Sequence, residues 1–205
     1  MKNRKGNFLI ILGLVFILAA AILCGFNLYE AENAKKNSEK AFSLISEKIE
    51  IKAEEKENFE TVPEEEIPDY ILNPEMEMPV IVVDGTEYIG TVEIPALGME
   101  LPVISEWSYP NLKKAPCRYF GSVYLDNMVV AGHNYNSHFK GLEELSAGEK
   151  VLFRDVDGNE FLYYVSAIEV LPPTAVEEMT SGEWDFTLFT CNATGTYRIA
   201  IRCDK

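Results

Sequence analysis

The chain has 205 residues, of which 47% are hydrophobic, and it carries 33 acidic against 18 basic side chains for a net charge of −15. This length and composition predict one ordinary folded domain with accessory segments and argue against wholesale disorder. Because so acidic an exterior repels phosphate backbones, the charge disfavours nucleic acid as a partner.

A membrane anchor is predicted close to the N-terminus. Residues 7–26 contain no charged side chain and are long enough, as a helix, to cross a hydrocarbon core of roughly 30 Å. Basic side chains precede this run, so the positive-inside rule keeps residues 1–6 cytoplasmic and sends the chain after about residue 27 outside the cell. A cleaved signal peptide is the alternative, but the apolar run exceeds a typical signal core.

An acidic stalk and linker are predicted for residues 27–79. Glu, Lys, Asn and Ala dominate its first part, where Phe42, Ile45 and Ile49 are spaced as one narrow stripe of a helix. We expect this helix to continue out of the membrane and to provide reach. Prolines between residues 61 and 79 exclude a long helix there and indicate a looser tether.

The remaining residues, 80–205, change to short β-rich runs separated by Gly, Asn and Asp. They predict strands at residues 88–95, 99–105, 122–126, 127–133, 150–156, 160–170, 186–191 and 197–203. Short helical inserts are predicted at residues 138–148 and 173–179. Eight strands in about 126 residues, with few helical inserts, indicate a mostly β protein built on a small closed barrel.

The last two predicted strands bring a cysteine and an arginine together. The first ends at Cys191, and five residues that include Gly195 separate it from the second. A hairpin at this point places Arg198 beside Cys191. An arginine in that position lowers the pKa of the thiol and offers donors to a developing oxyanion.

A thiol nucleophile also needs a proton carrier near neutral pH, and histidine is suited to it. The chain has two histidines. His133 ends an apolar strand after a glycine, whereas His138 opens the following predicted helix, where we interpret it as a solvated polar residue. Isolated histidines and strand cysteines are mostly structural, so spacing alone leaves a catalytic triad open.

Three short motifs occur together in one order. They are VVAGH at 129–133, TLFTC at 187–191 and YRIAIR at 197–202, and the stretch IGTVEIPALGMELPV at 89–103 precedes them. In this combination, and with an N-terminal anchor, residues 86–205 resemble the sortases, most closely class A or D. The resemblance implies an eight-stranded sortase-like β-barrel with short helices, after a transmembrane helix and stalk.

Carried over onto the matching positions, the resemblance implies a catalytic trio. Cys191 would be the nucleophile, His133 the general acid/base, and Arg198 the group that positions substrate and stabilises the oxyanion. Arg202 is the competing arginine, but Arg198 precedes the apolar run as the essential sortase arginine does. Thr190 would lie beside the scissile carbonyl.

The resemblance also implies a function. The substrate would be a surface protein with a Leu-Pro-x-Thr-Gly-like sorting signal, which a thioacyl intermediate transfers to an amine of a peptidoglycan precursor in a Gram-positive wall. Neither a metal nor an organic cofactor is expected. The loop over residues 171–185 would wall the peptide groove. Its expected substrate contacts are Ala175, Val176, Met179 and Trp184.

Other interpretations stay open at this point. They are a pilin-polymerising sortase, a non-catalytic extracellular binding module on the same barrel, a cysteine peptidase, and an L,D-transpeptidase, although the last would show a Ser-His-Gly-Cys run that this sequence lacks. Cys117 and Cys203 could form a disulfide or remain buried thiols.

Overall fold

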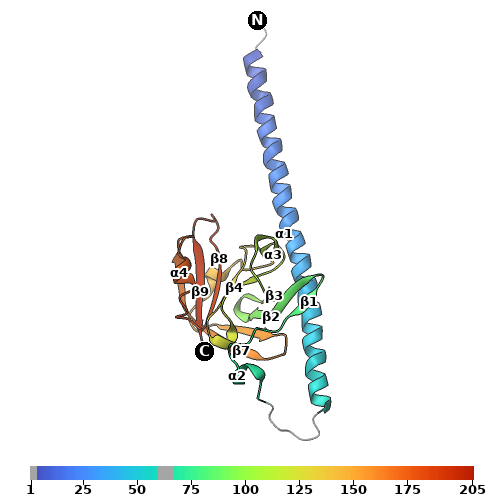
Figure 1. Cartoon of the computed structure of the whole chain (residues 1–205). Coiled ribbons are helices and arrows are strands. Elements are labelled where there is room, and N and C mark those ends of the chain that lie inside the picture. The colour runs from blue at the N-terminus through green and yellow to red at the C-terminus, as the bar shows by residue number, and fades with distance from the viewer. Residues whose placement is uncertain (1–3, 60–66) are drawn as a thin grey trace.

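A closed β-barrel and one long helix make up most of the molecule (Figure 1). The structure is a computed structural model that describes residues 4–59 and 67–205. Nine strands form one sheet in the order β1-β2-β3-β4-β5-β8-β9-β7-β6, and a further pairing of β2 with β6 closes it. The eight strands β2 to β9 therefore make the barrel, which confirms the predicted fold class, and β1 extends β2 as a short hairpin.

The strands have the following bounds: β1 Ile81–Val83, β2 Thr86–Ile94, β3 Met99–Ile104, β4 Cys117–Phe120, β5 Met128–Ala131, β6 Lys150–Asp155, β7 Glu160–Leu171, β8 Phe186–Cys191 and β9 Arg198–Asp204. Most pairs are antiparallel, but β3–β4 and β5–β8 are parallel. Along the first half of β7 exposed and buried residues alternate, as expected of a strand with one face on a core. Phe153, Tyr163 and Phe186 are among the large side chains that fill the barrel.

Two of the predicted elements are wrong. The predicted strand at residues 122–126 is a 3-10 turn, η2 (Val123–Leu125), because the Ser122 hydroxyl accepts a hydrogen bond from the Tyr124 N–H and Asp126 adopts a left-handed conformation. The strand in this part of the chain is β4, which the sequence pattern missed. The predicted helix at 138–148 is reduced to η3 (Leu142–Glu144), which Gly141 precedes with a φ of 90°.

The remaining helices are short. They are α2 (Asp69–Leu72), η1 (Pro95–Leu97), α3 (Tyr109–Leu112) and α4 (Val176–Met179). The last of these is the helical turn predicted within residues 173–179. The first part of the expected tether, residues 61–66, lies outside the described residues.

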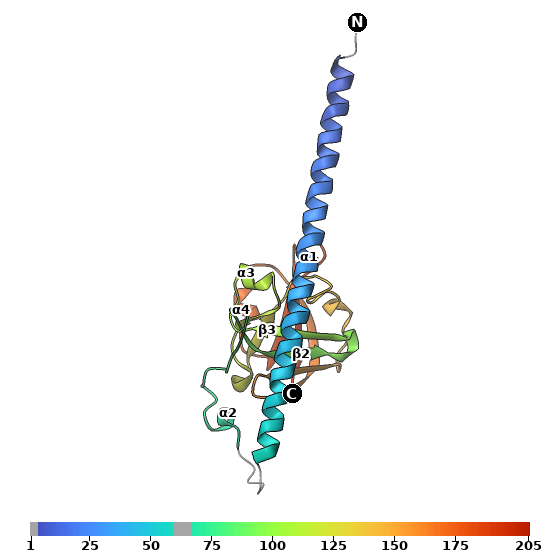
Figure 2. The same cartoon turned by 90° about the vertical axis from the view of Figure 1, so that its right-hand side faces the viewer.

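Helix α1 (Arg4–Phe59) runs without a break from the apolar segment to the stalk. It is long and apolar enough to cross a membrane, by length and composition. Figures 1 and 2 both show its second half lying along the outside of the barrel, beside β1, β2 and β3. The expected stalk is therefore packed on the folded domain over much of its length.

The docked face of α1 is made largely of small residues. Ala34, Ser38, Ala41, Ile45 and Ile49 are buried and recur every three or four positions. Ala41, Ile45 and Ile49 belong to a satellite core in which α1 meets Val83, Tyr88, Ile104, Leu112, Ala115, Cys117 and Ala131. Small side chains let the helix axis approach the sheet closely, so the two isoleucines reach fully buried positions.

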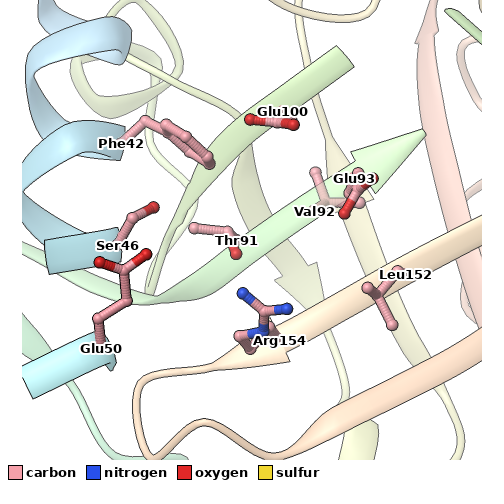
Figure 3. A pocket seen from close by; sticks show the side chains of 9 residues that line it. All are labelled: Phe42, Ser46, Glu50, Thr91, Val92, Glu93, Glu100, Leu152 and Arg154. Carbon is pink, nitrogen blue, oxygen red and sulfur yellow. The ribbon is translucent and has the colours of Figure 1, made fainter. Parts of the chain in front are cut away.

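A shallow cleft of about 230 Å³ flanks this contact, between α1 and strands β2, β3 and β6. Figure 3 shows Phe42 and Glu50 on the helix side and Arg154 on the sheet side. Phe42, the third member of the predicted apolar stripe, thus lies at the edge of the docked face.

Candidate active site

The β8–β9 hairpin places Cys191 and Arg198 directly opposite each other. They are the last pair in the register of the two strands, and both are half-buried. The turn closes through hydrogen bonds from the Asn192 N–H to the Tyr197 carbonyl at 3.0 Å and from the Gly195 N–H to the Asn192 carbonyl at 2.9 Å. Gly195 has a φ of 73°, a conformation that favours glycine. The predicted hairpin is confirmed.

The parallel pairing of β5 with β8 brings His133 to the same end of the barrel. Ala131 is paired with Phe189, and the Gly132 N–H extends the ladder by donating to the Phe189 carbonyl at 3.0 Å. His133 and Cys191 each lie two residues beyond that pair. His133 and Cys191 therefore follow at equivalent positions at the neighbouring ends of two parallel strands.

All three of these side chains line a single groove of about 260 Å³. Thr190 and Ala131 contribute to its floor, and the β7–β8 connection contributes a wall. The wall residues are Pro172, Pro173, Ala175, Val176 and Met179. Trp184, which we expected from the same connection, is not among the residues that line this groove.

An aromatic ladder that the sequence did not predict also contributes to the lining of the groove. Tyr109, Trp107, Tyr119 and Phe189 follow one another with ring centroids 5.1, 5.7 and 5.3 Å apart. All four line the groove. The signal available in the sequence was the cluster WSYP at residues 107–110, an aromatic pair in an otherwise polar connection.

The two arginines of β9 have different environments. The guanidinium of Arg202 is 2% exposed and donates to the Glu169 carboxylate at 2.8 Å and to the Glu178 carbonyl at 2.9 Å. It therefore ties α4 to the barrel. Among the described residues, the side chain of Arg198 donates two long hydrogen bonds of 3.4 Å, to the Gly195 and Tyr197 carbonyls. Arg198 thus keeps its donors for the groove.

The environment of His133 favours its neutral form. Burial lowers the pKa of the imidazole, and the charge of Lys113 lowers it further, while Glu30 of α1 acts in the opposite direction. Tyr135 stacks on the ring with centroids 4.6 Å apart. A neutral imidazole next to a thiol can accept its proton, which is the task of a general base.

His138 differs from its interpretation as a solvated residue. Its side chain is completely buried, as is that of the neighbouring Phe139, because the connection that carries them packs onto the barrel core. The hydroxyl of Thr190 is also buried, and its Oγ1 has no hydrogen-bond partner in the part of the chain that the structure describes.

The cysteines outside the groove are unpaired. Cys117 and Cys203 are free and completely buried, in the satellite core and in the barrel core respectively. Burial raises the pKa of each thiol to about 12, so neither is reactive near neutral pH. Within residues 4–59 and 67–205, no three His, Cys, Asp or Glu side chains are grouped so as to hold a metal ion.

Comparison with known proteins identifies the family. A family model described as the Sortase domain matches residues 92–205, more than half of the chain. The chain belongs to the sortase family. Sortase A of Bacillus anthracis is 25% identical to this sortase over 195 residues, which cover 92% of this chain and 89% of that protein.

Solved sortase structures share the fold. The sortase D5 transpeptidase of Clostridium perfringens has a TM-score of 0.56 at 17% identity, with 84% of this chain and 98% of that chain covered. Sortase C of Streptococcus pneumoniae has a TM-score of 0.53 at 24% identity, covering 80% and 93%. Sortases are cysteine transpeptidases that act on surface proteins bearing sorting signals. Membership therefore gives this chain its enzyme class.

Proposed function

We propose that this sortase cleaves a Leu-Pro-x-Thr-Gly-like sorting signal and joins the new carboxyl end to a cell-wall amine. The observation that carries the proposal is the convergence of Cys191, His133 and Arg198 at the ends of three neighbouring strands, on one groove. A thiol, a neutral imidazole and a guanidinium are the groups that thioacyl transfer requires.

In the acylation step, His133 takes the proton of the Cys191 thiol, and the thiolate attacks the threonine carbonyl carbon of the signal. Arg198 stabilises the oxyanion of the tetrahedral intermediate. The C–N bond then breaks, and the imidazolium returns its proton to the departing glycine amine. The products are a thioester on Cys191 and the released C-terminal peptide.

In the second step, the acceptor amine attacks the thioester carbonyl while His133 accepts the amine proton. The C–S bond breaks, and the thiolate of Cys191 leaves, so the protein becomes joined to the acceptor through a new amide. Splitting one difficult displacement into two easier ones is the benefit of the covalent intermediate.

The groove supports an apolar, uncharged signal ahead of the scissile bond. Ala175, Val176 and Met179, together with the aromatic ladder, contribute no carboxylate to its lining. We assign the leucine and proline of the signal to this space, with Thr190 beside the threonine carbonyl. Trp184 has no place in this assignment, because it lies outside the lining.

The orientation of the anchor is part of the proposal. With residues 1–6 cytoplasmic, α1 would carry the barrel on the outer face of a Gram-positive plasma membrane. Protein substrate and lipid-linked acceptor are then held on the same surface, and this raises their effective concentration at the groove.

The test is transfer by the full chain in detergent micelles, with a set of pentapeptide signals and amine acceptors. We expect ligated product from the wild type and none from Cys191→Ala. Transfer that persists in Cys191→Ala would remove the proposed nucleophile. A product formed only with a lysine of a pilin subunit would indicate pilin polymerisation instead, and an unreactive Cys191 towards a small alkylating agent would indicate a binding module.

A further inference from the structure

The second histidine of the chain has no part in the mechanism above, yet it lies in the same ring cluster as the first. The ring centroids of His133 and His138 are 6.0 Å apart, and the two planes differ by 14°. Tyr135 completes the cluster, 4.6 Å from His133 and 5.7 Å from His138. Both histidine rings are thus stacked in nearly parallel planes.

The two imidazoles are not joined in a direct proton relay. Such a relay requires a hydrogen bond between ring nitrogens about 3 Å apart. No hydrogen bond joins His138 to His133 in the structure. Neither ring nitrogen of His138 has a hydrogen-bond partner among the described residues, although the Lys114 backbone lies near enough to favour protonation slightly.

His138 is also neutral where the enzyme would work. Burial, and then the like charge of His133, lower the pKa of His138 to about 4. The other charged or titratable groups around His133 include Tyr135, which stacks on it, Lys113, Glu30 on α1, and Cys191 and Arg198 of the same groove. His138 therefore adds a flat uncharged surface to this environment rather than a charge.

The backbone of this connection is already fixed by hydrogen bonds. The Phe139 N–H donates to the His133 carbonyl at 3.0 Å, and the His138 N–H donates to the Tyr135 carbonyl at 3.0 Å. The Phe139 ring packs against Gly132. What these contacts leave open is the rotation of the His133 side chain, and the stacked rings are placed to restrict it.

We propose that His138 is a positioning residue for His133, whose parallel stacked ring holds the catalytic imidazole in the orientation that faces Cys191. The inference rests on the proposed role of His133 as the acid/base. Its chemical requirement is a flat, uncharged ring at position 138, and the nitrogens of the imidazole are dispensable.

A volume-matched pair of variants tests this requirement. His138→Phe keeps a flat ring, and His138→Leu keeps bulk without one. Because the chain has two histidines, His133 is the one imidazole left in either variant, and its NMR titration is assigned without ambiguity in an untagged full chain in micelles. The titration from about pH 5 to about pH 8 is combined with kcat and KM for a signal peptide.

We expect His138→Phe to leave the pKa of His133 unchanged and kcat within about threefold of wild type. In His138→Leu the freed imidazole becomes better hydrated, so its pKa should rise towards the ordinary value, and kcat should fall about tenfold at constant KM.

Two results would overturn the proposal. If His138→Leu keeps the pKa of His133 and kcat as well as His138→Phe does, the ring plane has no role. If His138→Phe shifts this pKa and lowers kcat as much as His138→Leu does, the imidazole nitrogens are required. The titration of His138→Phe alone decides the second point, even if the leucine variant does not fold. The titration of His133 can be measured in a protein that transfers no peptide. If the pKa of His133 then differs between His138→Phe and His138→Leu as expected, the positioning role is upheld, while the absence of transfer rejects the proposed function.

Discussion

Glu30 of α1 forms an ion pair with Lys113 at 2.7 Å. The pair links the first turn of the helix beyond the apolar span to the residue that directly follows α3, near His133. The pair joins residues 83 positions apart in the sequence. Both charges act on His133, the lysine lowering and the glutamate raising its pKa. The helix that carries the apolar span thus takes part in the electrostatics of the groove.

The first prediction concerns this pair. Glu30→Gln removes the charge that favours the imidazolium, so the pKa of His133 should fall further below its ordinary value. Lys113→Met removes the charge that opposes it, so the pKa should rise. Histidine NMR titration measures both. Lys40→Met, which breaks a second α1 ion pair with Asp84, is the matched control and should leave the titration unchanged. Equal titrations in all three variants would contradict the prediction.

Docking of α1 gives the second prediction. Ile45 is completely buried between the helix and the barrel, so Ile45→Ala should cost about 2–5 kcal/mol through lost burial and the cavity left behind. Faster hydrogen exchange of α1 amides around residues 34–49 and a lower free energy of unfolding would report the loss. Glu39→Ala, on the exposed face of the same helix, should change neither; a similar loss there would mean that the burial is not responsible.

The third prediction separates the two arginines. Arg198→Lys should lower kcat about 10²- to 10³-fold by weakening the oxyanion site, with stability within about 0.5 kcal/mol of wild type. Arg202→Met should instead destabilise the fold by about 3–5 kcal/mol, because it leaves Glu169 and the α4 carbonyls without their buried partner. Denaturant unfolding and peptide kinetics on both variants check this. The reverse assignment of effects would make Arg202 the catalytic arginine.

Gly132 supplies the fourth prediction. A Cβ at this position would lie 2.4 Å from Cδ2 of Phe139, closer than real contacts allow. Gly132→Ala should therefore displace the connection next to His133, cost about 1–3 kcal/mol and lower kcat. The double variant Gly132→Ala with Phe139→Leu should recover part of both losses, as unfolding and kinetics would show. Absence of any recovery would place the cause elsewhere.

The fifth prediction is a dependence of stability on pH. The folded pKa of His138 is about 4, against 6.5 for the free imidazole, so the unfolded state binds the proton first as pH falls. Neutral His138 therefore makes its full contribution to the free energy of unfolding above the unfolded pKa of 6.5. This contribution, at most about 3 kcal/mol, is lost as the pH falls from about 6.5 to about 4. His138→Phe should flatten this dependence. Fluorescence of Trp107 and Trp184 during unfolding at several pH values measures it, and an unchanged slope would refute it.

Much of the barrel could be predicted from the sequence because its strands alternate and are bounded by turn residues. Buried residues recur at every second position in β6 and in the first half of β7. The strand β4 was missed because it has only four residues, too few to show an alternating pattern, and it pairs with β3 through a single residue. The stretch at 122–126 has strand composition, but a single serine cap turned it into a 3-10 helix.

The docked face of α1 escaped for another reason. Hydrophobic periodicity counted Phe42, Ile45 and Ile49 and gave a narrow stripe, whereas Ala34, Ser38 and Ala41 are the residues that make close approach possible. Small residues carry no hydrophobic signal, although they decide such contacts. The burial of His138 could not be predicted either, because it depends on the tertiary position of one connection.

Some groove residues could be predicted from local sequence, and others could not. Cys191 and Arg198 follow from a local hairpin, whereas the approach of His133 depends on a parallel pairing between strands almost 60 residues apart. Only the resemblance of the motifs at 129–133 and 187–191 to those of sortases predicted that His133 and Cys191 lie together. The aromatic ladder joins Trp107 and Tyr109 from one connection to Tyr119 of β4 and Phe189 of β8, so it left no periodic pattern in the sequence.

Because α1 is unbroken, it sets the distance between the end of the apolar run and the barrel. Ala34, the first buried residue of the docked face, comes eight residues after Phe26, which at 1.5 Å per residue is roughly 12 Å of rigid rod. With α1 inserted in a membrane as proposed, this continuous helix would hold the domain in a thin layer over the lipid. The molecules that it joins would then have to be delivered into that layer.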